Sequence, residues 1–412
     1  MIIWEDSLLV GGGFNDKKGY IFAKDVNDNV VILDVWKRGE DRVNSNMVVM
    51  GTSGSGKSTA VKHIILNELA IGTKILVIDP ESEYKRMCKN LEGNWINTVS
   101  RQGQVINPLQ VRAEAPDVED EKVLGFVDEG NGMGALALHI QGIRPFFRLL
   151  FPDLTDIQMS IITRSLEEVY HKFGIDWNTD VSNYANTDFP IMEDLYIHIV
   201  NKLKELEKND NEEVKDYRIV EGYLRDVAVG VDSAIFNGHT TIEYDNDLTV
   251  LDTSALQNVE DRIKKAQYYN IFTFCWNIIS KNIEQKTILV CDEAYLMIDP
   301  QVPQSLIFLR NVSKRCRKYN GALVVISHSV VDFLDPSVKQ FGQGILDTAG
   351  FKILMGADGK NLEEMKELFK LTESEVDLIY SRQRGRALFL AGARRLNIKF
   401  DLPSYEFDYF GK

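Results

Sequence analysis

The chain has 412 residues, of which 44% are hydrophobic and 26% charged, a composition typical of a globular protein with two or three domains. Its net charge of −14 argues against a broadly basic surface that coats nucleic acid, although it is compatible with local basic patches. The four cysteines form no C-x-x-C pair, which disfavours a zinc site or a disulfide framework and fits a reducing cytoplasmic setting. No apolar run is long enough to span a membrane.

The first predicted element is a β-hairpin. Residues 19–36 alternate apolar and polar side chains around the turn Asn27-Asp28-Asn29. We assign residues 1–45 to this hairpin and to the polar lead-in that follows it.

The strongest motif of the sequence comes next. The apolar run Met47–Met50 predicts a buried strand, and the octapeptide GTSGSGKS that follows it fits G-x-x-x-x-G-K-[ST]. Apolar residues then recur close to helical spacing from Ala60 to Leu69. A strand, a glycine-rich loop and a helix are the setting in which this pattern binds phosphate, because loop N–H groups and the positive end of the helix dipole face the anion.

The motif predicts a site for ATP and Mg²⁺. Lys57 is expected to reach the β- and γ-phosphates and to act in catalysis, and the Ser58 hydroxyl is expected to ligate Mg²⁺. The predicted nucleotide-binding residues are Gly51, Thr52, Ser53, Gly54, Ser55, Gly56, Lys57, Ser58 and Thr59.

A second buried strand and a helical region follow. Residues 74–79 are apolar and end in Asp79, at the sheet edge where ligands bind in parallel α/β folds. The alternative is that Asp79 or Ser82 caps a helix that begins near Glu83. Residues 113–239 contain helical patterns and almost no strand signals, which predicts an all-α subdomain inserted between core segments 46–112 and 240–412.

The apolar strand at residues 287–291 runs into two carboxylates, which is the pattern of a Walker B element. Asp292 is expected to hold the Mg²⁺ shell, and Glu293 to accept a proton from the attacking water or to orient it. The helical insertion accounts for the long stretch of sequence between Lys57 and Asp292.

Residues 321–329 predict another buried strand with a polar end. In P-loop ATPases with a catalytic glutamate beside Walker B, a strand lies between the Walker A and Walker B strands and its tip contacts the γ-phosphate or water. Ser327 and His328 occupy that tip, and His328 is a candidate sensor of the γ-phosphate. The alternative is a polar strand end that faces solvent.

Two basic segments complete the motifs, at residues 310–319 and 381–395. ATPases that work as rings complete one subunit's site with an arginine from its neighbour. The alternatives are surface solubility, ion pairs with the acidic body of the chain, or contacts to nucleic-acid phosphates. The candidate arginines are Arg315, Arg317, Arg384 and Arg386.

These motifs together resemble those of the conjugative type IV secretion ATPases of the VirB/TraC/TrwK class, within the RecA-like group of P-loop motors. The resemblance covers residues 19–400 and implies a RecA-like α/β core with a mostly parallel sheet. The stretches that carry it are NMVVMGTSGSGKS, ILVIDPESEY, INPL, TVLDTSAL, ILVCDEAY, ISHS and RQRGRALFLAG.

The resemblance implies an ATP-hydrolysing motor that energises assembly of a secretion channel or pilus and transfer of DNA or protein. It implies other channel subunits as partners, a homo-oligomer that is often a hexamer, and a place at the cytoplasmic face of the membrane. The family often has glutamine where this chain has His328, and a large domain before the P-loop half. We therefore expect this chain to be the C-terminal motor portion of a longer protein.

Two other interpretations stay open from the sequence alone. One is a DNA translocase or helicase of the HerA/FtsK type, in which the basic segments contact nucleic acid. The other is a scaffold that binds nucleotide to control assembly and turns it over little.

Overall fold

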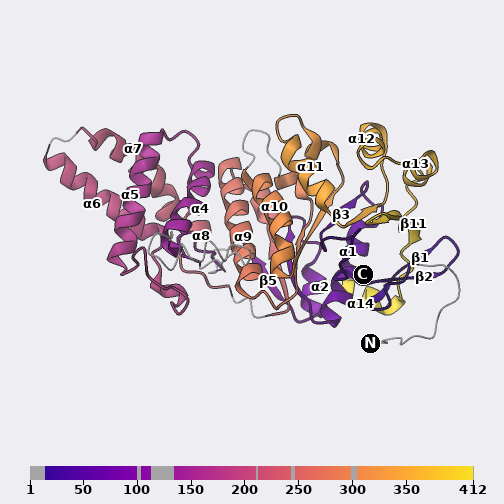
Figure 1. The fold of residues 1–412 in the computed structure, drawn as a ribbon. Helices are drawn as coiled ribbons and strands as arrows, with labels where there is room; N and C mark the ends of the chain where they lie inside the picture. Colours follow the sequence, from indigo (N-terminus) through magenta and orange to yellow (C-terminus); the bar gives the residue numbers. More distant parts are fainter. Residues whose placement is uncertain are drawn as a thin grey trace. The chain divides into compact units, whose positions relative to one another are not determined.

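The computed structural model of the chain describes residues 14–99, 104–112, 134–209, 212–242, 246–297 and 304–411 (Figure 1). The chain forms two units. Unit 1 comprises Met1–Trp95, Tyr244–Ser254 and Ile283–Lys412, and unit 2 comprises Ile96–Glu243 and Ala255–Asn282.

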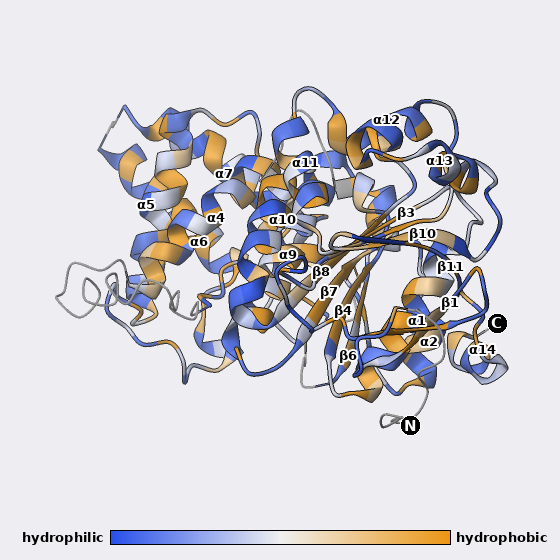
Figure 2. Cartoon of the chain, turned by 45° about the vertical axis from the view of Figure 1, so that its right-hand side comes forward, coloured by the Kyte–Doolittle hydropathy of each residue, from blue (hydrophilic) through white to orange (hydrophobic). Residues whose placement is uncertain are grey.

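The framework is an eleven-stranded sheet with the order β2-β1-β11-β10-β9-β3-β8-β7-β4-β6-β5. Its central strands run parallel to one another. They are β9 (Phe351–Leu354), β3 (Met47–Met50), β8 (Gly321–Ser327), β7 (Thr287–Cys291), β4 (Lys74–Asp79) and β6 (Leu248–Asp252). Strands β3, β8 and β7 are buried along their whole length and read as continuous apolar runs, as expected for a parallel sheet with two covered faces (Figure 2).

The strands beyond β9 are paired antiparallel. The strand β10 (Arg386–Ala391) pairs with β9 and with β11 (Arg394–Lys399). The predicted N-terminal hairpin is β1 (Tyr20–Asp25) and β2 (Val30–Leu33), and it joins the same sheet because β1 pairs with β11. The short strand β5 (Asn94–Asn97) lies beside β6 at the other edge. The predicted α/β class, with a mostly parallel sheet and an N-terminal hairpin, is confirmed.

Unit 1 also holds short helices. They are α1 (Lys57–Ala70), α2 (Lys85–Asn90), α10 (Gln304–Arg315), α11 (Lys339–Thr348), α12 (Gly359–Phe369), α13 (Glu373–Tyr380) and α14 (Ser404–Phe410), with single turns at η3 (Ala294–Met297), η4 (Cys316–Tyr319) and η5 (Val331–Leu334).

Helix α1 is tied to both ends of unit 1 through one buried imidazole. His63 Nε2 lies 3.0 Å from the carbonyl oxygen of Ile21, and Nδ1 lies 2.7 Å from the Glu406 carboxylate. Because a carbonyl oxygen only accepts, Nε2 carries a proton. This one side chain links the helix after the predicted phosphate loop to β1 and to α14.

Unit 2 is helical. Its helices are α4 (Ala135–Leu150), α5 (Asp156–Lys172), α6 (Met192–Lys208), α7 (Val214–Ala228), α8 (Ser233–Phe236) and α9 (Asp261–Lys281), with a single turn at η1 (Asn186–Asp188). Helix α5 begins at a capping box, in which the Thr155 hydroxyl accepts from Gln158 N at 3.3 Å and the Gln158 side chain accepts from Thr155 N at 3.0 Å. Among the described residues, no helix is long and apolar enough to cross a membrane.

Candidate active site

The loop between β3 and α1 needs glycine for its backbone path. Gly54 and Gly56 have φ angles of 78° and 108°, in the left-handed region that favours glycine. A Cβ atom on Gly51 would lie 2.7 Å from the Ser55 hydroxyl oxygen. The three glycines of the motif therefore serve the conformation of the loop itself.

Three segments far away in the sequence hold this loop. Gly51 N–H donates to the Ser327 carbonyl (3.3 Å), and Thr52 N–H donates to the Gly356 carbonyl (2.9 Å). From the other side, Gly385 N–H donates to the Ser55 carbonyl (2.9 Å). The loop is thus fixed by the tip of β8, the loop after β9 and the turn before β10.

The expected phosphate ligands lie at the start of α1. Lys57 is buried, and its ammonium donates to the carbonyl oxygens of Gly51 (2.8 Å) and Thr52 (3.3 Å). Among the described residues, no side chain caps the helix N-terminus. No side-chain cap therefore competes with an anion at this helix end, as the motif predicts.

The sheet order brings the Walker B carboxylates to the same edge. Strand β8 lies between β3 and β7, as predicted, so the residues that follow all three strands meet at their carboxyl ends. Asp292 is buried and accepts a hydrogen bond from Glu293 N–H (2.9 Å). Burial raises the pKa of Asp292 to about 7, and the nearby charge of Glu293 adds to the shift.

The tip of β8 contacts Glu293. Its carboxylate lies 3.0 Å from Nδ1 of His328, and the Tyr295 ring packs on the imidazole with 4.3 Å between ring centroids. The position of His328 was predicted from the sequence, but its pairing with Glu293 was not. No sequence signal marks this pair, because their positions are separated by the whole of α10 and β8.

The carboxylate at the end of β4 stabilises the backbone that follows it. Asp79 is fully buried and accepts hydrogen bonds from the N–H groups of Glu83 (3.0 Å) and Tyr84 (2.9 Å). Burial raises the pKa of Asp79 to about 6, while these bonds oppose the shift. Both N–H groups lie in the turn before α2, which begins at Lys85 without a side-chain cap, so Asp79 braces that turn.

A solved structure decides the family. VirB4 of Thermoanaerobacter pseudethanolicus is 41% identical in sequence and has a TM-score of 0.86, with 97% of this chain and 100% of that chain covered. The chain belongs to the VirB4 family. The predicted membership among the conjugative type IV secretion ATPases is confirmed.

Weaker matches point the same way. Residues 22–126 match the TraG P-loop domain. The chain is 23% identical to an uncharacterized protein of Bacillus anthracis over 96% of its own length, and 20% identical to Protein TraC of Escherichia coli (strain K12) over 85%. It spans 66% and 36% of the length of these two relatives. The plasmid coupling protein TrwB, in complex with the GTP analogue GDPNP, shares the fold at a TM-score of 0.51 and 14% identity, over 87% of this chain and 85% of that chain.

In this VirB4-family chain, the two basic segments lie at different edges of the sheet. Arg384 directly precedes Gly385, which is bonded to the phosphate loop of its own chain. Arg315 ends α10 and lies before the amino end of β8, roughly 20 Å of strand away from Ser327. Arg386 begins β10, and Arg317 lies in η4 beyond Arg315. Of the two basic segments, the one around Arg384 lies beside the phosphate loop of its own chain, and the one around Arg315 does not.

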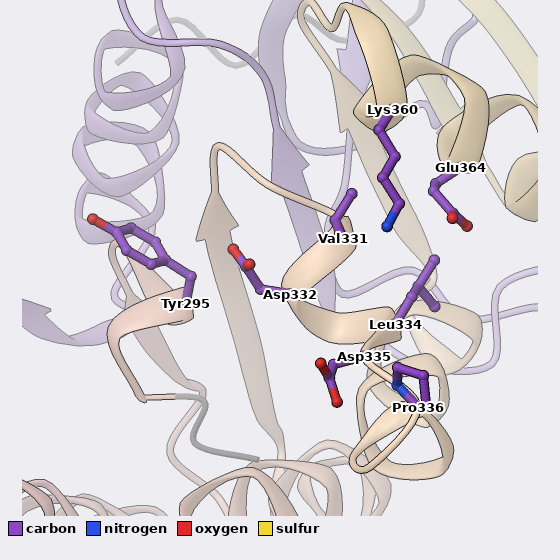
Figure 3. A pocket seen from close by; sticks show the side chains of 8 residues that line it. All are labelled: Tyr295, Val331, Asp332, Leu334, Asp335, Pro336, Lys360 and Glu364. Carbon is purple, nitrogen blue, oxygen red and sulfur yellow. The ribbon is translucent and has the colours of Figure 1, made fainter.

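A pocket of about 370 Å³ opens beside Tyr295 (Figure 3). Its lining combines apolar side chains with three carboxylates and one ammonium group. Tyr295 connects it to the site, because the same ring packs on His328. The lining residues are Tyr295, Val331, Asp332, Leu334, Asp335, Pro336, Lys360 and Glu364.

The donor atoms suit a magnesium ion shared with phosphates. In the described part of the chain, no group of three or more His, Cys, Asp or Glu side chains forms a metal site by itself. Mg²⁺ is usually held by one or two protein oxygens together with substrate phosphates and water. The Ser58 hydroxyl and the Asp292 carboxylate are oxygen ligands of that kind.

The pKa of Asp292 leads to a stability prediction for the metal-free protein. The pKa of Asp292 is 3.8 in its ordinary state and about 7 in the folded protein. Between pH 3.8 and pH 7, therefore, the carboxyl is protonated in the folded state and ionised in the unfolded chain. Above pH 7 the buried charge therefore costs up to about 4 kcal/mol, a cost that disappears as the pH falls toward 4. Asp292→Asn keeps an oxygen acceptor for Glu293 N–H and removes the charge.

We expect Asp292→Asn to raise the melting temperature in EDTA at pH 8 by roughly 4 °C, and this gain to shrink steadily toward pH 4. Asp377→Asn, on the exposed side of α13, is the matched control and should change the melting temperature by less than about 1 °C. A gain that is equal at all pH values would contradict the raised pKa.

Proposed function

We propose that this chain is the ATP-hydrolysing motor portion of a VirB4-type protein, which energises channel or pilus assembly and transfer of DNA or protein in type IV secretion. The observation that carries the proposal is the meeting of three sequence motifs at one sheet edge, after β3, β8 and β7. The similarity to VirB4 supports it, and the nucleotide analogue bound by TrwB supports a nucleotide as the ligand.

In the proposed mechanism, the N–H groups of the loop and Lys57 cradle the phosphates. Ser58 and Asp292 would hold Mg²⁺, which neutralises phosphate charge when it is bound. Glu293 accepts the proton of the attacking water, or orients that water, for attack on the γ-phosphate. The pairing with Glu293 gives His328 a second role besides the predicted one of sensing the phosphate.

The proposal extends to assembly. We infer that the active form is a homo-oligomer of six subunits, as the family resemblance implies, and that it docks on other channel subunits at the cytoplasmic face of the membrane. The helical insertion that we propose at residues 113–239, set in the core of 46–112 and 240–412, offers a separate surface for such partners.

Two substitutions test the hydrolytic site. Lys57→Ala is expected to lose nucleotide binding, because the loop loses the cation that faces the phosphates. Glu293→Gln is expected to bind ATP with the affinity of the wild type and to hydrolyse it at least roughly 100-fold more slowly. Steady-state hydrolysis and nucleotide titration of the three proteins measure both effects.

Glu373→Gln serves as a control, since that exposed carboxylate pairs only with Lys366 in the described structure and lies in α13. Failure of the wild type to bind ATP would refute the proposal. Equal rates for the wild type and Glu293→Gln would remove Glu293 from its role.

In this proposal the two basic segments act on the nucleotide sites of different subunits. Arg384 is beside the phosphate loop of its own chain, and an arginine side chain can span the short distance from there to a bound phosphate. Arg315 lies at the opposite sheet edge, so it can act on a nucleotide only in a neighbouring subunit. Arg384 therefore serves its own site, and Arg315 the site of its neighbour.

Mixed oligomers separate these two roles. Lys57→Ala mixed with Arg315→Ala should regain hydrolysis, because a Lys57→Ala subunit supplies Arg315 to a neighbour whose own loop is intact. Lys57→Ala mixed with Arg384→Ala should regain none, since both defects lie in the site of the chain that carries them. Lys57→Ala mixed with Glu293→Gln is the matched control and should also stay inactive; recovery with Arg384→Ala would reverse the assignment.

A further inference from the structure

We propose that Tyr295 is a positioning residue for hydrolysis: its ring fixes the imidazole of His328, which in turn holds the carboxylate of Glu293 in place. The inference rests on the proposed function, because it requires that Glu293 act on the attacking water. No motif in the sequence assigns a role to Tyr295.

The first link is the hydrogen bond between His328 and Glu293. An ionised carboxylate only accepts hydrogen bonds, so Nδ1–H of His328 donates to Oε2 over 3.0 Å. This bond engages one carboxylate oxygen and leaves Oε1 for a water molecule. The Glu293 side chain is only 16% exposed, whereas that of His328 is 42% exposed. A half-exposed imidazole keeps rotamer freedom unless another group restricts it.

The second link is the ring of Tyr295. It meets the imidazole at 4.3 Å between centroids and at an interplanar angle of 67°, an edge-to-face contact. This contact favours one rotamer of His328, the one that points Nδ1 at Glu293. The ring therefore acts on Glu293 through His328.

A single turn of the backbone sets this geometry. Glu293 has a φ of 44°, and its carbonyl accepts from Leu296 N–H at 2.9 Å, which closes the turn that begins η3. Tyr295 lies inside this turn, two residues after Glu293. The carboxylate and the phenol ring are thus both presented to His328 from one hydrogen-bonded turn.

The phenol hydroxyl is not needed for this role. Burial and the negative charges of Glu293, Glu81 and Asp332 raise the pKa of Tyr295, so its ring stays neutral. Tyr295 also lines the pocket of Figure 3. A phenylalanine ring would keep the packing on His328.

Kinetics of five variants test the inference. Tyr295→Phe should keep kcat within twofold of the wild type, whereas Tyr295→Ala should lower kcat roughly three- to tenfold and leave KM for ATP and nucleotide affinity unchanged. Tyr295→Ala combined with His328→Ala should be no slower than His328→Ala alone, because both act through one path. Tyr295→Leu gives the same measurement with a side chain of greater volume if the alanine variant does not fold.

The inference is overturned if Tyr295→Ala and Tyr295→Leu hydrolyse ATP like the wild type. It is also overturned if Tyr295→Phe is as slow as they are, or if the double variant shows the product of the two single losses. Failure of the proposed function looks different, since Glu293→Gln would then equal the wild type. A slow Glu293→Gln variant together with a fast Tyr295→Ala variant would refute the role of Tyr295 alone.

Discussion

The backbone path of the loop between β3 and α1 is the constraint on which this structure depends. Its left-handed glycines allow the chain to turn sharply, but they do not hold the loop in place. Hydrogen bonds with Ser327, Gly356 and Gly385 do so. Each of these partners lies at the end of a different part of the sheet, so strand order and loop conformation depend on each other.

The sequence predicted the parts of the site that have local signals. The phosphate loop, the strand ending in Asp292 and Glu293, and the tip at His328 each follow an apolar run, and the relation between parallel strands places them at one edge. The α/β class followed from the same alternation of strands and helices. These features needed only short-range patterns and one rule about sheets.

The rest depended on contacts between distant residues. Gly356 has no motif of its own, and its role appears only when β9 pairs with β3. Arg315 and Arg384 cannot be distinguished by sequence, since both lie in basic segments. In the folded chain they lie at opposite edges of the sheet. Asp79 shows the converse case, because a strand ending in an acid fits a ligand site and a helix cap equally well until its hydrogen bonds are known.

A structure of this chain with Mg²⁺ and a non-hydrolysable ATP analogue is the most direct test of the central claim. We expect the triphosphate on the loop from Gly51 to Ser58, with the metal between the Ser58 hydroxyl and the Asp292 carboxylate. An analogue bound away from this loop, or no bound analogue at saturating concentration, would contradict it.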